Sequence, residues 1–436
     1  MTASPPRLLR VVGLAGLTAI ALNGVVGAGI FVLPATVYRL AGAASPLAYV
    51  VAAVLMALVV ACFAEAGSRS EETGGPYLYA RDAFGELVGF LIGWLFFLTR
   101  LLATGAIANA FVAYLGYFEP ALATGAGRVA AITVAVGGLA AVNVYGVRGA
   151  SRTVNVFTIA KLLPLTVLII AGLGAIDPAR VALHAPPALG SLRQGALLLM
   201  FAYGGFENAN VPTEEAVNPR RHLPIALLTT IAAVAVIYVL IQVVAQGVLP
   251  GLADSPTPLA SAAREVLGAP GGWLLTVGAI VSTLGSISAV ILVGPRLLYA
   301  FARHGQLPAA LATIHPRHRS PHRAVIVFSV LVWAVAVFVD FARLAALSAV
   351  CRLLFSAGVC LAVPVLRRRQ GAAAAAFVLP GGPLIPLLAV ALSAWLLSDL
   401  SAAQATAGAI GIAAGFAVYA GQRWLRSACR EPDQRR

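Results

Sequence analysis

The residues of this chain best suited to bind a small molecule lie in two glycine-rich stretches, each of which interrupts an apolar run. They are Asn23–Phe31, which reads NGVVGAGIF, and Phe201–Asn208, which reads FAYGGFEN. Each lies roughly 12 residues into its run, or about 18 Å along a helix, which is the middle of a bilayer. Non-helical backbone at that depth survives only where it lines a cavity or is buried in protein, and interrupted segments in matching halves of a chain indicate a transporter's substrate site.

A helix break between Gly24 and Gly29 would free backbone groups of opposite polarity. The N–H groups of a half-helix that begins near Ile30 form the positive end of its dipole and suit a carboxylate. The carbonyls that end the preceding half-helix suit an ammonium group or a cation. The backbone alone could therefore hold both charges of an α-amino acid. The alternative is that these small residues form a packing face for another helix.

Lys161 is the single lysine among thirty basic residues, and it lies inside an apolar run. An ammonium group can lose its proton when it is desolvated, whereas a guanidinium group effectively cannot. A charge at this depth marks a functional residue by default, so Lys161 is a candidate for coupling. The alternative is a lysine that snorkels or pairs with a carboxylate and has no role in transport.

Glu207 and Arg100 are also ionisable and also fall within apolar runs. Glu207 could accept a proton, accept hydrogen bonds from freed backbone N–H groups, or pair with Arg100. Arg100 could bind an anionic substrate side chain, but we favour its pairing with Glu207, because a lone intramembrane arginine usually marks an internal ion pair. Thr104, one turn beyond Arg100, is a candidate for the side-chain pocket.

The elements that must position these residues are transmembrane helices. With 436 residues, a mean hydropathy of +0.91 and only 11% charged residues, the chain has the composition of an all-α polytopic membrane protein. We expect the first span to be retained rather than removed as a signal peptide. Apolar runs of about 18 residues or more predict twelve spans, near 11–37, 44–66, 87–118, 128–147, 153–175, 192–213, 223–249, 271–302, 323–341, 345–366, 377–399 and 403–424.

The distribution of basic residues predicts the orientation of these spans. With a cytoplasmic N-terminus, twenty of the thirty Lys and Arg residues fall in cytoplasmic tails and loops and six in external segments. This obeys the positive-inside rule, so we expect a multi-pass protein of the inner or plasma membrane with both termini cytoplasmic. The net charge of +14 is then a signal of topology and of contact with membrane lipids, not of nucleic-acid binding.

Several other kinds of chemistry are disfavoured by the sequence. The four cysteines include no Cys-x-x-Cys pair, and the histidine spacing matches no usual metal-ligand pattern, so we expect no metal and no cofactor. The absence of a Gly-x-x-x-x-Gly-Lys loop disfavours ATP as the energy source. A membrane-embedded enzyme would gather its ionisable residues at one depth, and a channel would not need two broken helices. Oligomeric state stays open between monomer and homodimer.

Five short motifs make the chain similar to the amino acid–polyamine–organocation permeases. They are GAGIF at 27–31, GGPY at 74–77, FAYGGFE at 201–207, EEAVNP at 214–219 and ARHGQLP at 302–308. The resemblance implies a leucine-transporter-type fold of twelve transmembrane helices, in which a five-plus-five inverted repeat has helices 1 and 6 broken. The repeats would be 11–175 and 192–366, followed by peripheral helices over 377–424, with tails at 1–10 and 425–436.

The family implies a secondary active transporter that moves amino acids by alternating access, independently of sodium, with proton coupling as a symporter or exchange as an antiporter. A polyamine or organic-cation carrier is the alternative, although it would require more acidic side chains than Glu207. Carried over to this sequence, the family's substrate contacts fall on Val25, Gly27, Ala28, Gly29, Ile30, Phe201, Ala202 and Gly204.

The resemblance also assigns a role to each part of this site. The amides around Gly27, Ala28 and Gly29 would hold the substrate carboxylate, and the carbonyls of Val25, Phe201 and Gly204 its amino group. Phe201 would be the gating aromatic that occludes the substrate. Position 28 is Ala where many relatives have Ser, so a hydroxyl contact is missing.

Lys161 resembles a fifth-helix lysine of the sodium-independent members. Its ammonium would bridge the first helix to the eighth, near Ser282, Thr283 and Ser286, and replace sodium there.

Overall fold

The computed structural model describes residues 12–69, 75–145, 150–183, 186–210, 216–316, 318, 320–370 and 375–430. Within these residues the chain is helical, and its one β-type pairing is an isolated parallel bridge between Val12 and Ala216. The α-helices in chain order are α1 (Leu14–Val25), α2 (Ala28–Ala41), α3 (Ser45–Ser68), α4 (Pro76–Phe84), α5 (Glu86–Leu115), α6 (Gly125–Tyr145), α7 (Ala150–Leu173), α8 (Pro178–Val181), α9 (Leu189–Ala202), α10 (Pro219–Val248), α11 (Pro258–Arg303), α12 (His322–Phe338), α13 (Phe341–Gln370), α14 (Leu384–Leu397) and α15 (Ala402–Arg430).

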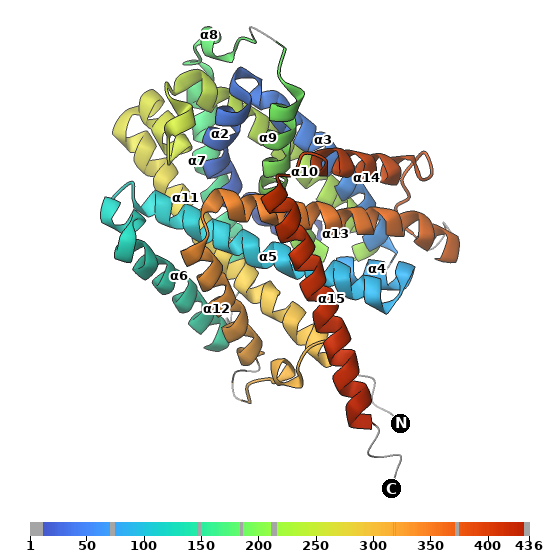
Figure 1. Ribbon diagram of the computed structural model, residues 1–436. Helices are drawn as coiled ribbons and strands as arrows, with labels where there is room; N and C mark the ends of the chain where they lie inside the picture. The colour runs from blue at the N-terminus through green and yellow to red at the C-terminus, as the bar shows by residue number, and fades with distance from the viewer. Residues whose placement is uncertain are drawn as a thin grey trace.

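The helices pack as a bundle in which partners are often distant in sequence. Helix α3 packs against α10, and α5 packs against both α11 and α13. Figure 1 shows α5 and α13 crossing the centre of the molecule, with α15 lying over them on the outside. Helices α6 and α12 lie side by side at one edge, where the Trp333 indole donates to the Thr133 hydroxyl over 2.9 Å.

The lengths and apolar character of the helices confirm a polytopic, all-helical membrane protein. In the described part of the chain, seven segments are long and apolar enough to cross a membrane, and four further apolar helices have 10–17 residues. Many large apolar side chains face outward, among them Phe338 and Val134, which are 79% and 74% exposed. Exposure of such apolar surfaces to water would be unfavourable in free energy, whereas contact with the equally apolar lipid chains carries no such penalty.

Three of the expected spans differ clearly from the observed helices. The span expected at 377–399 is α-helical only over α14, from Leu384 to Leu397. The span expected at 192–213 is α-helical only as far as Ala202, because the chain leaves the α-helix just before its glycine pair. The span expected at 271–302 belongs to the longer helix α11, which starts with Pro258 at its first turn. A kink at Gly268, with φ of +68°, separates the extra turns from the rest, and glycine adopts that φ without steric penalty.

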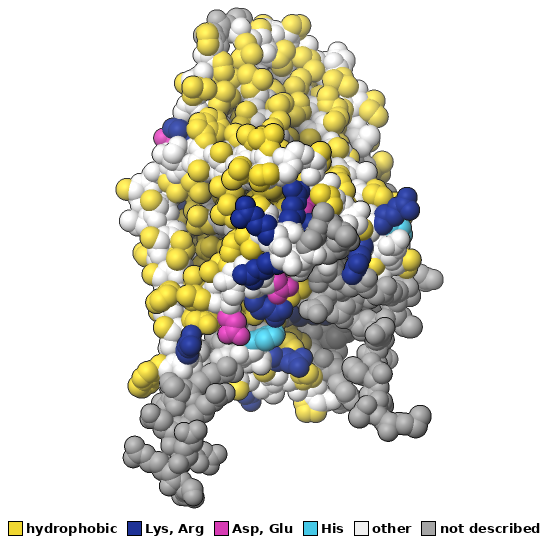
Figure 2. All heavy atoms as spheres, turned by 90° about the vertical axis from the view of Figure 1, so that its right-hand side faces the viewer, with side chains coloured by type: hydrophobic (Ala, Val, Ile, Leu, Met, Phe, Trp, Pro, Cys, Tyr) yellow, Lys and Arg dark blue, Asp and Glu magenta, His cyan; other side chains and the backbone are white. Residues whose placement is uncertain are grey.

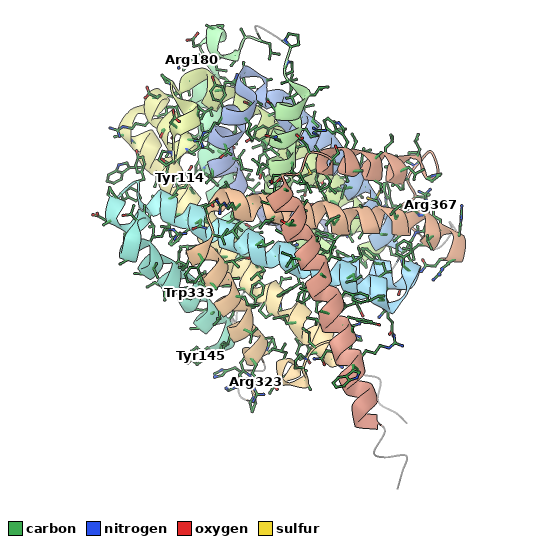
Figure 3. All side chains as sticks on the ribbon, in the orientation of Figure 1. Tyr114, Tyr145, Arg180, Arg323, Trp333 and Arg367 are labelled. Carbon is green, nitrogen blue, oxygen red and sulfur yellow. The ribbon has the colours of Figure 1, made fainter. Side chains whose placement is uncertain are left out.

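Polar and apolar side chains occupy different parts of the molecular surface. Figure 2 shows hydrophobic side chains over the upper part of one face and basic side chains clustered over its middle and lower part. Arg180, in α8, lies at one extreme of the molecule, and Arg323, at the start of α12, lies at the opposite extreme (Figure 3). Tyr145, at the end of α6, lies at the same extreme as Arg323.

A fully buried carboxylate ties the end of α3 to the end of α13. Glu65 accepts hydrogen bonds from Arg69 over 2.7 Å, from the Arg367 Nε over 2.7 Å and from the Leu379 backbone N–H over 2.9 Å. Arg367, labelled in Figure 3 near the end of α13, also donates to the carbonyl of Gly382. The segment before α14 is thereby fixed to two helices of the bundle.

We expect Glu65→Gln to destabilise the protein by about 2 kcal/mol, because Arg367 loses its carboxylate but keeps carbonyl partners. The measurement is the apparent melting temperature of the purified chain in detergent. Arg343→Gln is the control, since it removes an exposed ion pair with Asp340 and should change little. Equal shifts for the two variants would contradict a structural role for the Glu65 cluster.

Candidate functional site

The first glycine-rich stretch is a helix break, as predicted. Helix α1 ends at Val25 and α2 begins at Ala28, slightly earlier than the Ile30 expected from the sequence. Between them Val26 has ψ of 85°, and Gly27 is extended, with φ of −120° and ψ of −151°. The first N–H groups of α2 therefore have no partner within the helix and form its positively polarised end.

The second stretch is also a break. Helix α9 ends at Ala202, and the 3₁₀ helix η3 (Phe206–Asn210) follows after Gly205, whose φ is +117°. A side chain at that φ would be strained, so a glycine is required there.

The two breaks touch each other through their backbones. A Cβ atom on Gly29 would lie 2.6 Å from the Ala202 Cα, and one on Gly24 would overlap the carbonyl oxygen of Gly205. A Cβ on Gly205 would in turn overlap the carbonyl oxygen of Gly24. At Gly24 and Gly29, the packing explanation of the small residues is therefore correct, and what they pack against is the other break. Gly27 differs, because the nearest atom to a Cβ there is the Ser286 Oγ at 3.6 Å.

Tyr238 joins the two breaks from α10. Its hydroxyl lies 3.0 Å from the carbonyl oxygen of Val25, which ends α1, and 3.4 Å from that of Ala202, which ends α9. The Tyr238 ring is fully buried, with its centroid 5.1 Å from that of Tyr203. Tyr238 was not among the residues predicted from the sequence, where it stands out only as a tyrosine in the middle of an apolar run.

Lys161 lies between the first break and α11. Its Nζ donates to the carbonyl of Asn23 over 3.1 Å and to the Ser286 Oγ over 3.3 Å, and the residue is 1% exposed. Of the three hydroxyl residues expected nearby, Ser286 makes this contact. Thr283 donates to the carbonyl of Ala279 in its own helix instead.

Glu207 is the centre of an ion cluster beside the second break. Its Oε2 accepts a hydrogen bond from the Gly205 N–H over 2.8 Å and lies 3.3 Å from an Arg100 Nη, while its Oε1 pairs with Arg352. The pairing with Arg100 and the acceptance of a freed backbone N–H are thus both present. Arg352 was missed, although an arginine inside an apolar run of α13 is itself a signal. The two guanidinium groups stabilise the negative charge of the carboxylate.

Phe201 and Thr104 have clear neighbours. The Phe201 ring packs edge-to-face on Phe341, with ring centroids 5.7 Å apart and an interplanar angle of 88°. Phe341 also lines a cavity of about 820 Å³, together with Asn109 and Arg128. The Thr104 hydroxyl donates to the carbonyl of Arg100 over 2.7 Å, so its hydrogen bond is made within α5 and is not directed at another helix.

The remaining predicted residues, Ile30 and Ala202, are buried next to the breaks, at 0% and 2% exposure. Among the described residues there is no group of three or more His, Cys, Asp or Glu that could hold a metal ion.

Comparison with known proteins yields a family and several relatives. A family model described as amino acid permease matches residues 12–417. The chain is 29% identical to a methylthioribose transporter of Bacillus subtilis over 94% of its own length and 93% of the relative's. It is 29% identical to the branched-chain amino acid permease BcaP of the same species, over 92% and 90% of the two chains. It is also 31% identical to the large neutral amino acids transporter small subunit 2 of Mus musculus, over 73% and 63%.

The contacts between the breaks predict opposite outcomes for two glycine substitutions. Gly29→Ala should destabilise the fold by about 1–3 kcal/mol, because the new methyl group meets Ala202 at 2.6 Å. Gly27→Ala should leave the fold stable, because its Cβ has room. The check is the yield of monodisperse protein and its apparent melting temperature for each variant. Equal stability of the two variants would mean that the breaks do not pack as described.

Proposed function

The chain belongs to the amino acid permease family, and we propose on this basis that it is a secondary active transporter that moves amino acids across the cell membrane by alternating access. The family and the relatives are permeases rather than enzymes. The observation that carries the proposal is the pair of helix breaks in direct backbone contact, which brings the amides that begin one helix and the carbonyls that end two others together inside the bundle.

The substrate would bind through the backbone of both breaks. The amides of Gly27, Ala28 and Gly29 stand at the positive end of α2 and suit a carboxylate. The carbonyls of Val25, Phe201 and Gly204 suit the amino group. The names of two relatives, a branched-chain amino acid permease and a large neutral amino acids transporter, support amino acids as the substrate class.

The path from one side would be closed by aromatic rings. The Phe201 ring lies against Phe341, and Phe341 borders the 820 Å³ cavity, so displacement of this pair would open the cavity toward the breaks. We assign gating to Phe201 on this ground.

Lys161 would replace a sodium ion. Its buried ammonium links a carbonyl of the first broken helix to a hydroxyl of α11, two oxygen groups of the kind that coordinate cations. The transporter would accordingly work without sodium, by proton symport or by exchange. A lysine can release its proton when conformational change alters its surroundings, whereas Glu207 is held between two arginines. We therefore assign the coupling role to Lys161 and the support of the second break to Glu207.

The arrangement in the membrane would be the twelve-span, five-plus-five inverted repeat with both termini in the cytoplasm. The opposite positions of Arg180 and Arg323 support the expected arrangement of spans, because the two residues fall in segments expected on opposite sides of the membrane (Figure 3). A polyamine or organic-cation carrier is the weaker alternative, because Glu207 beside the second break is already paired with two arginines.

The proposal is tested by uptake of radiolabelled amino acids into proteoliposomes of the purified chain, with sodium or choline outside. Accumulation into empty vesicles under an inward proton gradient would identify a symporter, and uptake only into preloaded vesicles an exchanger. Equal uptake in sodium and choline is expected in both cases. Failure of every amino acid, with uptake of putrescine or spermidine, would replace the proposal with the polyamine alternative.

Lys161→Met should abolish uptake while leaving the protein folded, because it removes the ammonium but keeps most of the buried volume. The measurements are initial uptake rate and monodispersity on size-exclusion chromatography. The control is Arg343→Gln, which removes one positive charge at an exposed position. Unchanged uptake by Lys161→Met would show that the ammonium does not replace a coupling ion.

A further inference from the structure

The ion cluster beside the second break carries more positive than negative charge. Arg100 and Arg352 share one carboxylate, that of Glu207, and the three side chains are 4%, 3% and 0% exposed. Among the described residues, neither the Nε of Arg100 nor that of Arg352 has a hydrogen-bond partner. A buried net charge of this kind is strongly unfavourable unless an ion of opposite sign compensates it.

The surroundings of the cluster are apolar and aromatic. The Arg100 guanidinium lies 4.7 Å from the centroid of the Phe96 ring, and Phe96 packs on Phe355 with centroids 5.3 Å apart. Phe355 in turn contacts Phe63, so a run of rings borders the cluster. In such a low-dielectric environment, the attraction between the excess positive charge and an anion is stronger than it would be in water.

The cluster is also next to the proposed substrate site. A Cβ atom on Gly204 would overlap the Arg352 guanidinium, so this group lies directly against the backbone of the break. Ser356, one turn beyond Arg352 on α13, is 1% exposed, and its hydroxyl has no partner in the described part of the chain. The Arg352 guanidinium, whose Nε is without a partner in the described part of the chain, therefore lies beside any ligand bound at the break.

We propose that the Arg100–Glu207–Arg352 cluster is a binding site for one monovalent anionic group beside the second break. Two sources share this chemistry. One is the side-chain carboxylate of an acidic amino acid whose α-amino and α-carboxyl groups bind at the breaks. This first source rests on the proposed function. The other is a free inorganic anion such as chloride. In both cases the added negative charge balances the excess positive charge of the cluster.

The experiment measures ligand binding by thermal shift on the full purified chain in sodium gluconate, at constant ionic strength. L-glutamate is compared with L-glutamine, and L-aspartate with L-asparagine, because each pair differs in charge at nearly equal size. Sodium chloride is compared with additional sodium gluconate. A substrate carboxylate predicts at least about tenfold tighter apparent binding of the acidic member of a pair, a difference of about 1.4 kcal/mol. A free anion predicts stabilisation by chloride without that preference.

Variants locate the site. Arg352→Gln leaves a neutral Arg100–Glu207 pair, so the preference for the anion should disappear, whereas Arg352→Lys keeps the charge and should retain it. Arg343→Gln removes an exposed arginine and should behave like the unmodified chain. Retention of the anion preference by a folded Arg352→Gln variant would overturn the proposal. If that variant does not fold, the ligand comparison on the unmodified chain decides.

Other outcomes separate this inference from the proposed function. Equal binding of both members of each pair, with no effect of chloride, would overturn the anion site and leave an amino acid transporter. Stabilisation by chloride without binding of these four amino acids would support the anion site as a site for a free anion, and the uptake assay with the full set of amino acids would then decide the proposed transport function separately.

Discussion

Hydrocarbon offers no partner to a backbone amide or carbonyl, and this constraint governs where the chain can depart from a helix. Both departures inside the bundle occur where backbone meets backbone, at Gly24 against Gly205 and at Gly29 against Ala202. Each break is thereby shielded from lipid by the other. Neighbouring helices supply further partners, through the Tyr238 hydroxyl, the Lys161 ammonium and the Glu207 carboxylate. These three buried polar side chains thus stabilise the two breaks.

The same logic explains the distribution of charge along the bundle. Glu65, at the end of α3, is surrounded by donors from α13 and from the segment before α14, and it fastens a peripheral part of the chain. Glu207, near the centre, fastens the second break to α5 and α13. Two buried carboxylates of the described chain therefore fix non-helical segments to neighbouring helices. Each does so through arginines, whose planar guanidinium groups donate several hydrogen bonds at once.

Much of the site could be predicted from the sequence because its signals are local. Glycine density located both breaks, and the single lysine and the intramembrane Glu207 stood out by residue type alone. What the sequence could not predict was which helix faces which. The pairing of Arg352 with Glu207 and of Tyr238 with Val25 joins positions more than 140 residues apart, as set by helix packing. A hydrophobic run fixes the depth of a residue but not the direction in which its side chain points, and an almost uniformly apolar helix gives little periodicity to determine it.

Tyr238 gives the centre of the molecule an unusual property. A hydroxyl group carries one hydrogen, so it can direct a strong hydrogen bond at the carbonyl of Val25 or at that of Ala202 but not at both. The carbonyl that does not receive this hydrogen needs a donor from another group. A bound group with several hydrogens, such as an ammonium, could donate to both carbonyls at once. The protein with that group bound would then have the more complete set of hydrogen bonds.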